Sequence, residues 1–128
     1  MTNMTDLSID SLTMGVVNTA PTTEDLGTGA SPAISIKDGV ALLTRAGVCA
    51  ATLANPVATT DDFKRLTILS TTANAHTVAI ATTGFGNAGA GKVKATFQGT
   101  YKGDTLDLMA YGGFWYVTGF HQVTFGVA

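Results

Sequence analysis

The sequence predicts an all-β fold, a β-sandwich or jelly-roll-like barrel of about eight or nine short antiparallel strands. Two observations carry this prediction. Apolar residues recur at every second position over runs of about five residues, as in Ile34/Ile36, Leu66/Ile68 and Val78/Ile80, which is the period of a strand with one buried face. Turn-forming residues separate these runs at intervals of about 8–12 residues, the spacing typical of sandwiches and small barrels. No segment shows a convincing helical pattern, and there is no precise internal repeat.

The strands follow one another from residue 33 to the end of the chain. We expect them at 33–37, 40–44, 48–53, 65–70, 76–82, 93–98, 105–110, 114–118 and 122–127. Asp38-Gly39 predicts a tight hairpin between the first two strands, because glycine accepts the positive φ that such a turn requires. Asn55-Pro56 ends the third strand, and Tyr111-Gly112-Gly113 forms the turn before the eighth.

The first 32 residues differ from this body. Between Met1 and Asn18, apolar residues are scattered among polar ones without clean alternation: Leu7, Ile9, Leu12, Met14, Val16 and Val17. Residues 19–32 contain two prolines, two glycines and many hydroxyl side chains, which cannot support a packed core on their own. The sequence therefore predicts an extended arm over 1–32, either frayed or ordered against a neighbouring subunit, and a body over 33–128.

Composition narrows the classes of partner. The 128 residues carry a net charge of −2, and the seven Lys and Arg residues are dispersed, so no basic stripe is available for nucleic acid. No segment approaches the run of about 18 apolar residues that a membrane helix needs. The N-terminus lacks the basic and apolar regions of a secretory signal, so we expect synthesis in a cytoplasm. The charged fraction of 12% leaves two interpretations open: part of the surface faces other protein, or Thr and Ser supply its polarity.

Little of the sequence predicts catalysis or a cofactor. Cys49 is the only cysteine and lies in an apolar segment, where cysteine is typically a small core residue. The glycine-rich segment 84–91 has the GxGxxG spacing by accident, but the segment after it alternates like a strand, whereas a dinucleotide site needs a helix there. A long hairpin loop is the expected structure.

The titratable residues also show no pattern that predicts catalysis or metal binding. His76 and His121 belong to no metal-binding pattern, although copies of one histidine around a threefold axis could hold a metal; we expect His76 at a strand start, hydrogen-bonded to a neighbouring loop. Asp61-Asp62 is expected to be solvated or to cap a turn, and Asp104 and Asp107 show no acid–base spacing. We therefore expect no enzyme, no cofactor and no small-molecule substrate.

Aromatic residues are densest between Tyr111 and Tyr116. In a strand, Phe114 and Tyr116 point to one face and Trp115 and Val117 to the other. One face is expected to be core. The other is expected to form a subunit interface, with a sugar-stacking platform as the less common use of such a surface.

Several short segments together resemble a known family. They are Thr52-Leu53-Ala54-Asn55-Pro56, Leu66-Thr67-Ile68, Ala75-His76-Thr77-Val78, Ala95-Thr96-Phe97, Gly103 to Ala110 and Trp115-Tyr116-Val117. In this order they resemble the small β-domains of head decoration (cement) proteins of tailed bacteriophages and related head-fibre and tail modules. The resemblance covers about residues 33 to 120, and its motifs are structural rather than chemical.

The resemblance implies a function on the virion. A protein of this family would assemble as a homotrimer, bind the major capsid protein on the outer surface of the head, and stabilise the expanded shell after synthesis in the bacterial host. The interface residues we expect are Leu7, Ile9, Leu12, Val16, Val17, Phe85, Tyr111, Phe114 and Tyr116. The alternative is a receptor- or glycan-binding module of a phage tail or head fibre, with Phe85, Tyr101 and Tyr111 as exposed binding residues.

Overall fold

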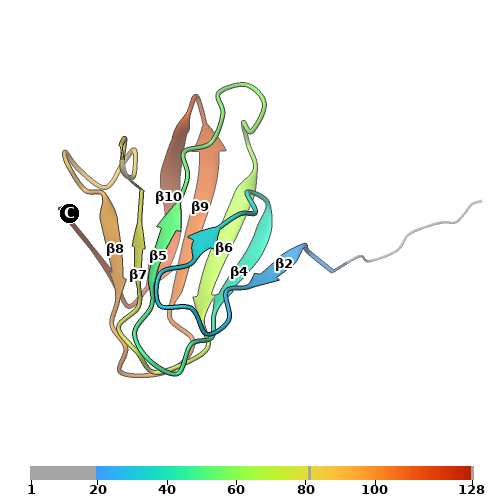
Figure 1. Ribbon diagram of the computed structural model, residues 1–128. Helices are drawn as coiled ribbons and strands as arrows, with labels where there is room; N and C mark the ends of the chain where they lie inside the picture. The colour runs from blue at the N-terminus through green and yellow to red at the C-terminus, as the bar shows by residue number, and fades with distance from the viewer. Residues whose placement is uncertain (1–19, 81, 128) are drawn as a thin grey trace, which may run out of the picture.

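The computed structural model describes residues 20–80 and 82–127 and confirms the all-β class (Figure 1). Ten strands form two sheets of five, and no described segment is helical, so no helix long and apolar enough to cross a membrane occurs there. The strands are β2 (Thr23–Asp25), β3 (Ala33–Ile34), β4 (Gly39–Leu43), β5 (Ala50–Leu53), β6 (Arg65–Ser70), β7 (Thr77–Ala79), β8 (Lys94–Phe97), β9 (Thr105–Tyr111), β10 (Phe114–His121) and β11 (Val123–Gly126). Each of the nine predicted strands is present, and β2 is added to them.

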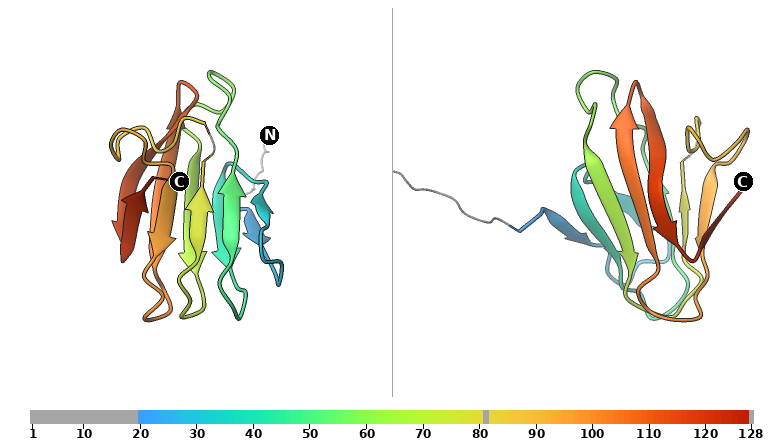
Figure 2. Two further views of the ribbon diagram at one scale, coloured as in Figure 1. Left: turned by 60° about the vertical axis from the view of Figure 1, so that its left-hand side comes forward. Right: turned by 180° about the vertical axis from the view of Figure 1, so that it is seen from behind.

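The chain passes repeatedly from one sheet to the other. One sheet has the order β10-β9-β6-β4-β2 and the other β11-β8-β7-β5-β3. Successive strands therefore form five pairs, and each pair has one strand in each sheet. The pairs are β2/β3, β4/β5, β6/β7, β8/β9 and β10/β11. These pairs stack side by side, and their connections between the sheets lie at the lower end in Figure 2.

The expected antiparallel order is wrong for half of the strand contacts. β2, β4 and β6 pair in parallel, as do β3, β5 and β7, and only the contacts made by β8 to β11 are antiparallel. In the first three strand pairs the chain runs up one sheet and down the other in the same sense. Strands that are neighbours within a sheet are therefore parallel. The hairpin loop between β7 and β8 then reverses the chain. Neither sheet closes on itself in the described residues, so a barrel is not confirmed.

The predicted hairpin at Asp38-Gly39 is also wrong, because β3 and β4 belong to different sheets. Gly39 has a φ of 125°, and a Cβ there would lie 2.1 Å from the carbonyl oxygen of Thr22. The adjacent Val40 N–H donates to that same oxygen at 2.8 Å. Glycine is required here because β2 passes close beside β4, rather than because the chain reverses.

The core fills the space between the two sheets. Every second residue of the long strands points inward, and Trp115 is fully buried, with its indole N–H donating to the carbonyl oxygen of Ala54 at 2.9 Å. The alternation that predicted the strands therefore also identified the core. Its members are Ile34, Ala41, Leu43, Cys49, Ala51, Leu53, Leu66, Ile68, Val78, Ile80, Phe85, Ala95, Phe97, Leu106, Leu108, Ala110, Trp115 and Val123.

The described part of the predicted arm is joined to the body. β2 lies at the edge of one sheet, and the carbonyl oxygens of Ala30 and Pro32 accept hydrogen bonds from Ala50 and Thr52 of β5. Glu24 accepts bonds from the backbone and hydroxyl of Ser35. Residues 1–19, with the predicted interface residues Leu7, Ile9, Leu12, Val16 and Val17, lie outside the described residues.

The glycine-rich loop covers the free edge of β10. Gly86 N–H donates to the carbonyl oxygen of Trp115 at 2.8 Å, and Phe85 forms a β-bridge with Trp115. The side chain of Asn87 pairs with both backbone groups of Val117, accepting from its N–H at 2.8 Å and donating to its carbonyl oxygen at 2.9 Å. An amide side chain thus takes the place of a neighbouring strand.

Candidate functional site

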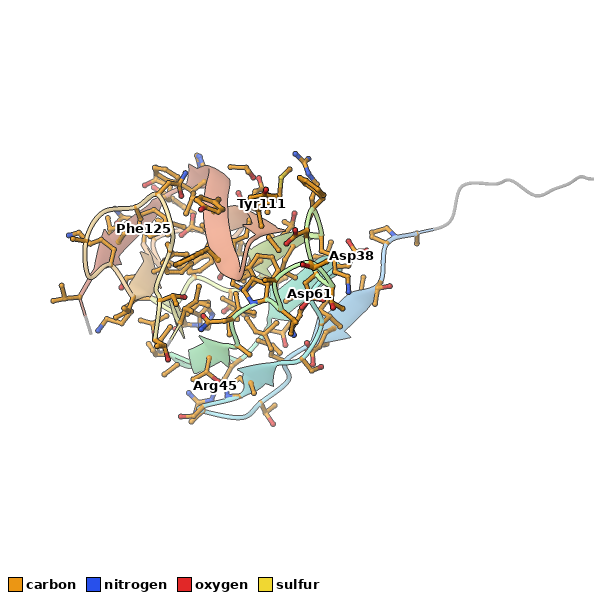
Figure 3. The ribbon with its side chains drawn as sticks, turned by 90° about the horizontal axis from the view of Figure 1, so that it is seen from above. Asp38, Arg45, Asp61, Tyr111 and Phe125 are labelled. Carbon is orange, nitrogen blue, oxygen red and sulfur yellow. The ribbon has the colours of Figure 1, made fainter. Side chains whose placement is uncertain are left out.

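Two pairs of aromatic side chains lie near the β9–β10 turn. Phe63 and Tyr111 lie with ring centroids 5.4 Å apart, and Phe114 and Tyr116 lie 6.3 Å apart. Tyr111 and Phe114 are directly opposed across the two strands, so their side chains share one face of the sheet. We call these four residues the aromatic patch. Figure 3 looks onto this end of the molecule, with Tyr111 labelled.

The patch is exposed although it is strongly apolar. Phe63 is 66% exposed, Tyr111 53% and Phe114 38%, while Tyr116 is partly covered. Val57, on the same connection between β5 and β6 as Phe63, is 54% exposed. Singly exposed apolar residues are common, but a group of neighbouring exposed aromatic residues is typical of a site that binds another molecule.

The backbone around Phe63 is held by hydrogen bonds on both sides. Phe63 N–H donates to the carbonyl oxygen of Ala110 at 2.6 Å, and Ala110 N–H donates to that of Lys64 at 2.9 Å. Phe63 itself has a φ of 69°, in the left-handed region that a bulky side chain rarely adopts. The loop therefore retains a strained conformation that presents an aromatic ring to solvent beside Tyr111.

Two neighbouring carboxylates fix the loop that carries Phe63. Asp61 is buried, accepts from Lys64 at 2.9 Å and from Val57 N–H at 2.7 Å, and lies 3.2 Å from Lys37. The hydrogen bond from Lys64, followed by that from Val57, holds the pKa of Asp61 well below its usual range. Asp62 accepts from Gly112 N–H at 2.9 Å in the β9–β10 turn. Both carboxylates accept backbone N–H groups in turns, as the capping expectation predicted. The alternative expectation, that the pair is solvated, is wrong for Asp61, which is buried.

His76 is a buried structural residue. Cys49 N–H donates to its Nδ1 at 3.1 Å, so the ring proton is on Nε2 and is donated to Thr72 Oγ1 at 2.8 Å. The hydroxyl of Thr72 donates in turn to the carbonyl oxygen of Arg45. Burial, and to a smaller extent Arg45, lowers the pKa of His76. Both ring nitrogens are engaged within the protein, which leaves neither free for a metal.

The other candidate residues for chemistry are dispersed. Cys49 is buried in the core, as expected, and burial raises the pKa of its thiol. Asp104 is buried beside Gly99 N–H, while His121 is exposed at the end of β10. Within residues 20–80 and 82–127 no three His, Cys, Asp or Glu side chains come together as metal ligands.

The structure brings together some of the predicted interface residues and separates others. Tyr111, Phe114 and Tyr116 lie in the aromatic patch. Phe85 is only 2% exposed and packs edge-on against Phe125, so the prediction that it is an exposed binding residue is wrong. Its position among glycines suggested a solvent-facing loop, but the loop folds back onto β10.

One member of the aromatic patch was missed at the level of sequence. Phe63 joins the patch from a loop far from Tyr111 in sequence, and its only signal is that it is a lone aromatic residue after two aspartates. Tyr101 is 75% exposed, as expected, but it lies outside the patch, in the connection between β8 and β9 at the opposite end of β9 from Tyr111.

The sequence matches no protein-family model, and a comparison with curated proteins finds no match.

Proposed function

We propose that this protein is a capsid decoration protein that binds the outer surface of a bacteriophage head as a homotrimer and stabilises the expanded shell. The aromatic patch is the surface that docks on the major capsid protein. This function makes the protein a structural component of the virion and not an enzyme. Residues 1–19 contribute further anchoring to neighbouring capsid subunits.

The observation that carries this proposal is the grouping of Phe63, Tyr111, Phe114 and Tyr116 at one end of the molecule, with three of the four side chains exposed. Aromatic side chains contribute large apolar contact area and are enriched where protein interfaces are energetically strongest. The hydrogen bonds of Asp61, Asp62 and Ala110 order the patch before binding, so little conformational entropy is lost on docking. The low charge of the chain and the resemblance of residues 33–120 to decoration proteins agree with this use.

Co-sedimentation with purified, expanded heads of the phage whose genome carries this sequence tests the proposal. Tyr111→Ser removes a ring from the middle of the patch and is expected to weaken binding about tenfold or more, because loss of a central interface residue typically costs about 2 kcal/mol. The matched control is Tyr101→Ser, which makes the same change at an exposed tyrosine outside the patch.

Equal occupancy of the heads by wild type and Tyr111→Ser would show that the patch is not the docking surface. If wild type does not sediment with expanded heads at all, the decoration function itself is wrong. The control variant is expected to bind like wild type, which separates loss of the patch from a general effect of replacing a surface tyrosine.

A further inference from the structure

A polar hollow lies on the outer face of the sheet that carries the patch. It has a volume of about 340 Å³ and is formed where β6, β9 and β10 run side by side. Its walls are the side chains of Arg65, Thr67, Asp107 and Thr118, together with the strand segments at Leu66 and Leu108. This volume falls at the lower end of the range of ligand pockets, about 300–1,000 Å³.

An irregularity of β10 lies beside the hollow. The pairing of β10 with β9 shifts between Val117 and Gly119, so Thr118 has no partner across the strand. Gly119 stands opposite Asp107 and has no side chain to cover it. A Cβ at Gly119 would lie 3.4 Å from Asp107 Oδ2, which is an ordinary contact. Residue 119 therefore puts no side chain over this carboxylate, and bulges of this kind often re-aim side chains beside binding sites.

The hydrogen-bonding capacity of the hollow is only partly used within the protein. Thr67 Oγ1 donates to Asp107 Oδ1 at 2.7 Å, and no described residue donates a hydrogen bond to Asp107 Oδ2. Arg65 is exposed, and in the part of the chain that the structure describes it forms no ion pair. The hollow thus offers a strong acceptor, a guanidinium with several donors and two hydroxyl groups.

We infer that this hollow binds a sugar residue of a neutral glycan. Each sugar hydroxyl both donates and accepts, so neighbouring hydroxyls can donate to the Asp107 carboxylate and accept from Arg65. A small anion would meet the carboxylate of Asp107, and a small cation would meet the guanidinium of Arg65, so charge disfavours both. The inference goes beyond capsid docking and does not depend on it.

Amide chemical-shift titration of the isotope-labelled full chain tests the inference. The probes are the methyl glycosides of glucose, galactose, mannose and N-acetylglucosamine, added singly. At least one is expected to shift the amides of Thr67, Asp107 and Thr118 in a saturable way. Asp107→Asn is expected to weaken binding about tenfold, because hydrogen bonds to a charged group are the stronger ones.

Filling the hollow provides the sharper comparison. Gly119→Ala places a methyl group over Asp107 and is expected to weaken the affinity at least tenfold. Gly126→Ala, on β11 with open space around the new methyl group, is the matched control and is expected to bind like wild type. If no probe shifts the hollow's amides, or if Gly119→Ala binds as tightly as wild type, the inference is wrong. Thermal unfolding of each variant confirms that the fold is kept.

Discussion

At the scale of single residues, a substitution of Phe63 can distinguish the proposed binding from the stability of the fold. Its left-handed φ costs about 1–2 kcal/mol for an ordinary residue, whereas asparagine tolerates this region well. Its contact with Tyr111 recovers about 0.5–1.5 kcal/mol. These two contributions nearly cancel, so the residue adds little to the stability of the isolated protein.

We therefore predict that Phe63→Asn changes the free energy of unfolding by less than about 1 kcal/mol while weakening attachment to expanded heads. Chemical denaturation measures the first quantity and co-sedimentation the second. A large loss of stability without any loss of attachment would mean that the ring serves the fold and not a partner.

His76 makes the stability of the fold depend on pH. Its folded pKa lies below the usual value of about 6.5, because burial disfavours the charged ring and Arg45, to a smaller extent, repels it. The unfolded chain therefore takes up a proton at higher pH than the folded one. The contribution of His76 is complete above about pH 6.5 and is lost as the pH falls toward its folded pKa.

We predict that the free energy of unfolding, measured by denaturation at several pH values, decreases from about pH 7 to pH 5. His76→Asn is expected to flatten this dependence, since its side-chain oxygen can accept from Cys49 N–H and does not titrate. His121→Asn, at the exposed histidine, is the matched control and should retain the slope. An unchanged slope in His76→Asn would assign the dependence to other groups.

At the scale of elements, the edge strand β10 is protected by a side chain. Asn87 supplies both hydrogen bonds that a neighbouring strand would supply to Val117. Asn87→Ala is expected to lower the free energy of unfolding by about 1–2 kcal/mol, for two partly exposed bonds, and to promote self-association through the freed edge. Denaturation and light scattering measure the two effects.

The matched control for this prediction is Asn55→Ala, which removes an amide that accepts a single hydrogen bond from Thr83. A smaller destabilisation and no new self-association are expected from it. If the two variants behave alike, the pairing of Asn87 with Val117 does not protect the edge.

The sequence predicted the positions of the strands more reliably than it predicted which strands pair with one another. Alternation such as Leu66/Ile68 depends only on which face of a strand is buried, and this is a local property. The parallel pairing of β4 with β6 depends on the 21 residues between them and on β5, which lies in the other sheet. Asp38-Gly39 was misleading because close approach by β2 requires a glycine as much as a hairpin does.

The same distinction applies to the candidate site. Tyr111, Phe114 and Tyr116 are neighbours along one hairpin, so sequence alone could place them together. Phe63 reaches them through a long loop, and the burial of Phe85 follows from the return of its loop to Trp115. Contacts of this kind depend on tertiary structure, which no local pattern in a single sequence encodes.

At the scale of the whole molecule, five stacked strand pairs give two ends with different roles. The connections within the strand pairs lie at one end, where His76 and Thr72 join the β6–β7 connection to the β4–β5 connection through Cys49 and Arg45. The other end carries Phe63 and the β9–β10 turn, held together by Asp62. A rigid stack closed by hydrogen bonds at one end can present an aromatic surface at the other without reorganising when a partner binds.

The extent of the anchoring segment can be tested at this scale by two deletions. Removal of residues 1–19 leaves every described strand in place, so the free energy of unfolding should be unchanged. Removal of 1–32 also deletes the pairing of β2 with β4 and four further backbone hydrogen bonds, those of Val40, Leu26, Ala50 and Thr52 with their partners. At about 1 kcal/mol each, this loss should destabilise the body by several kcal/mol.

Light scattering and co-sedimentation then distinguish assembly from attachment. If the body forms the trimer, the chain lacking 1–19 should keep three times its own monomer mass, as the full chain should show about 39 kDa for three copies of 13.1 kDa. It should nevertheless occupy expanded heads less completely, because each trimer loses three anchoring segments that act together. Undiminished occupancy would confine docking to the body. A monomeric truncated chain beside a trimeric full chain would instead mean that residues 1–19 hold the trimer together.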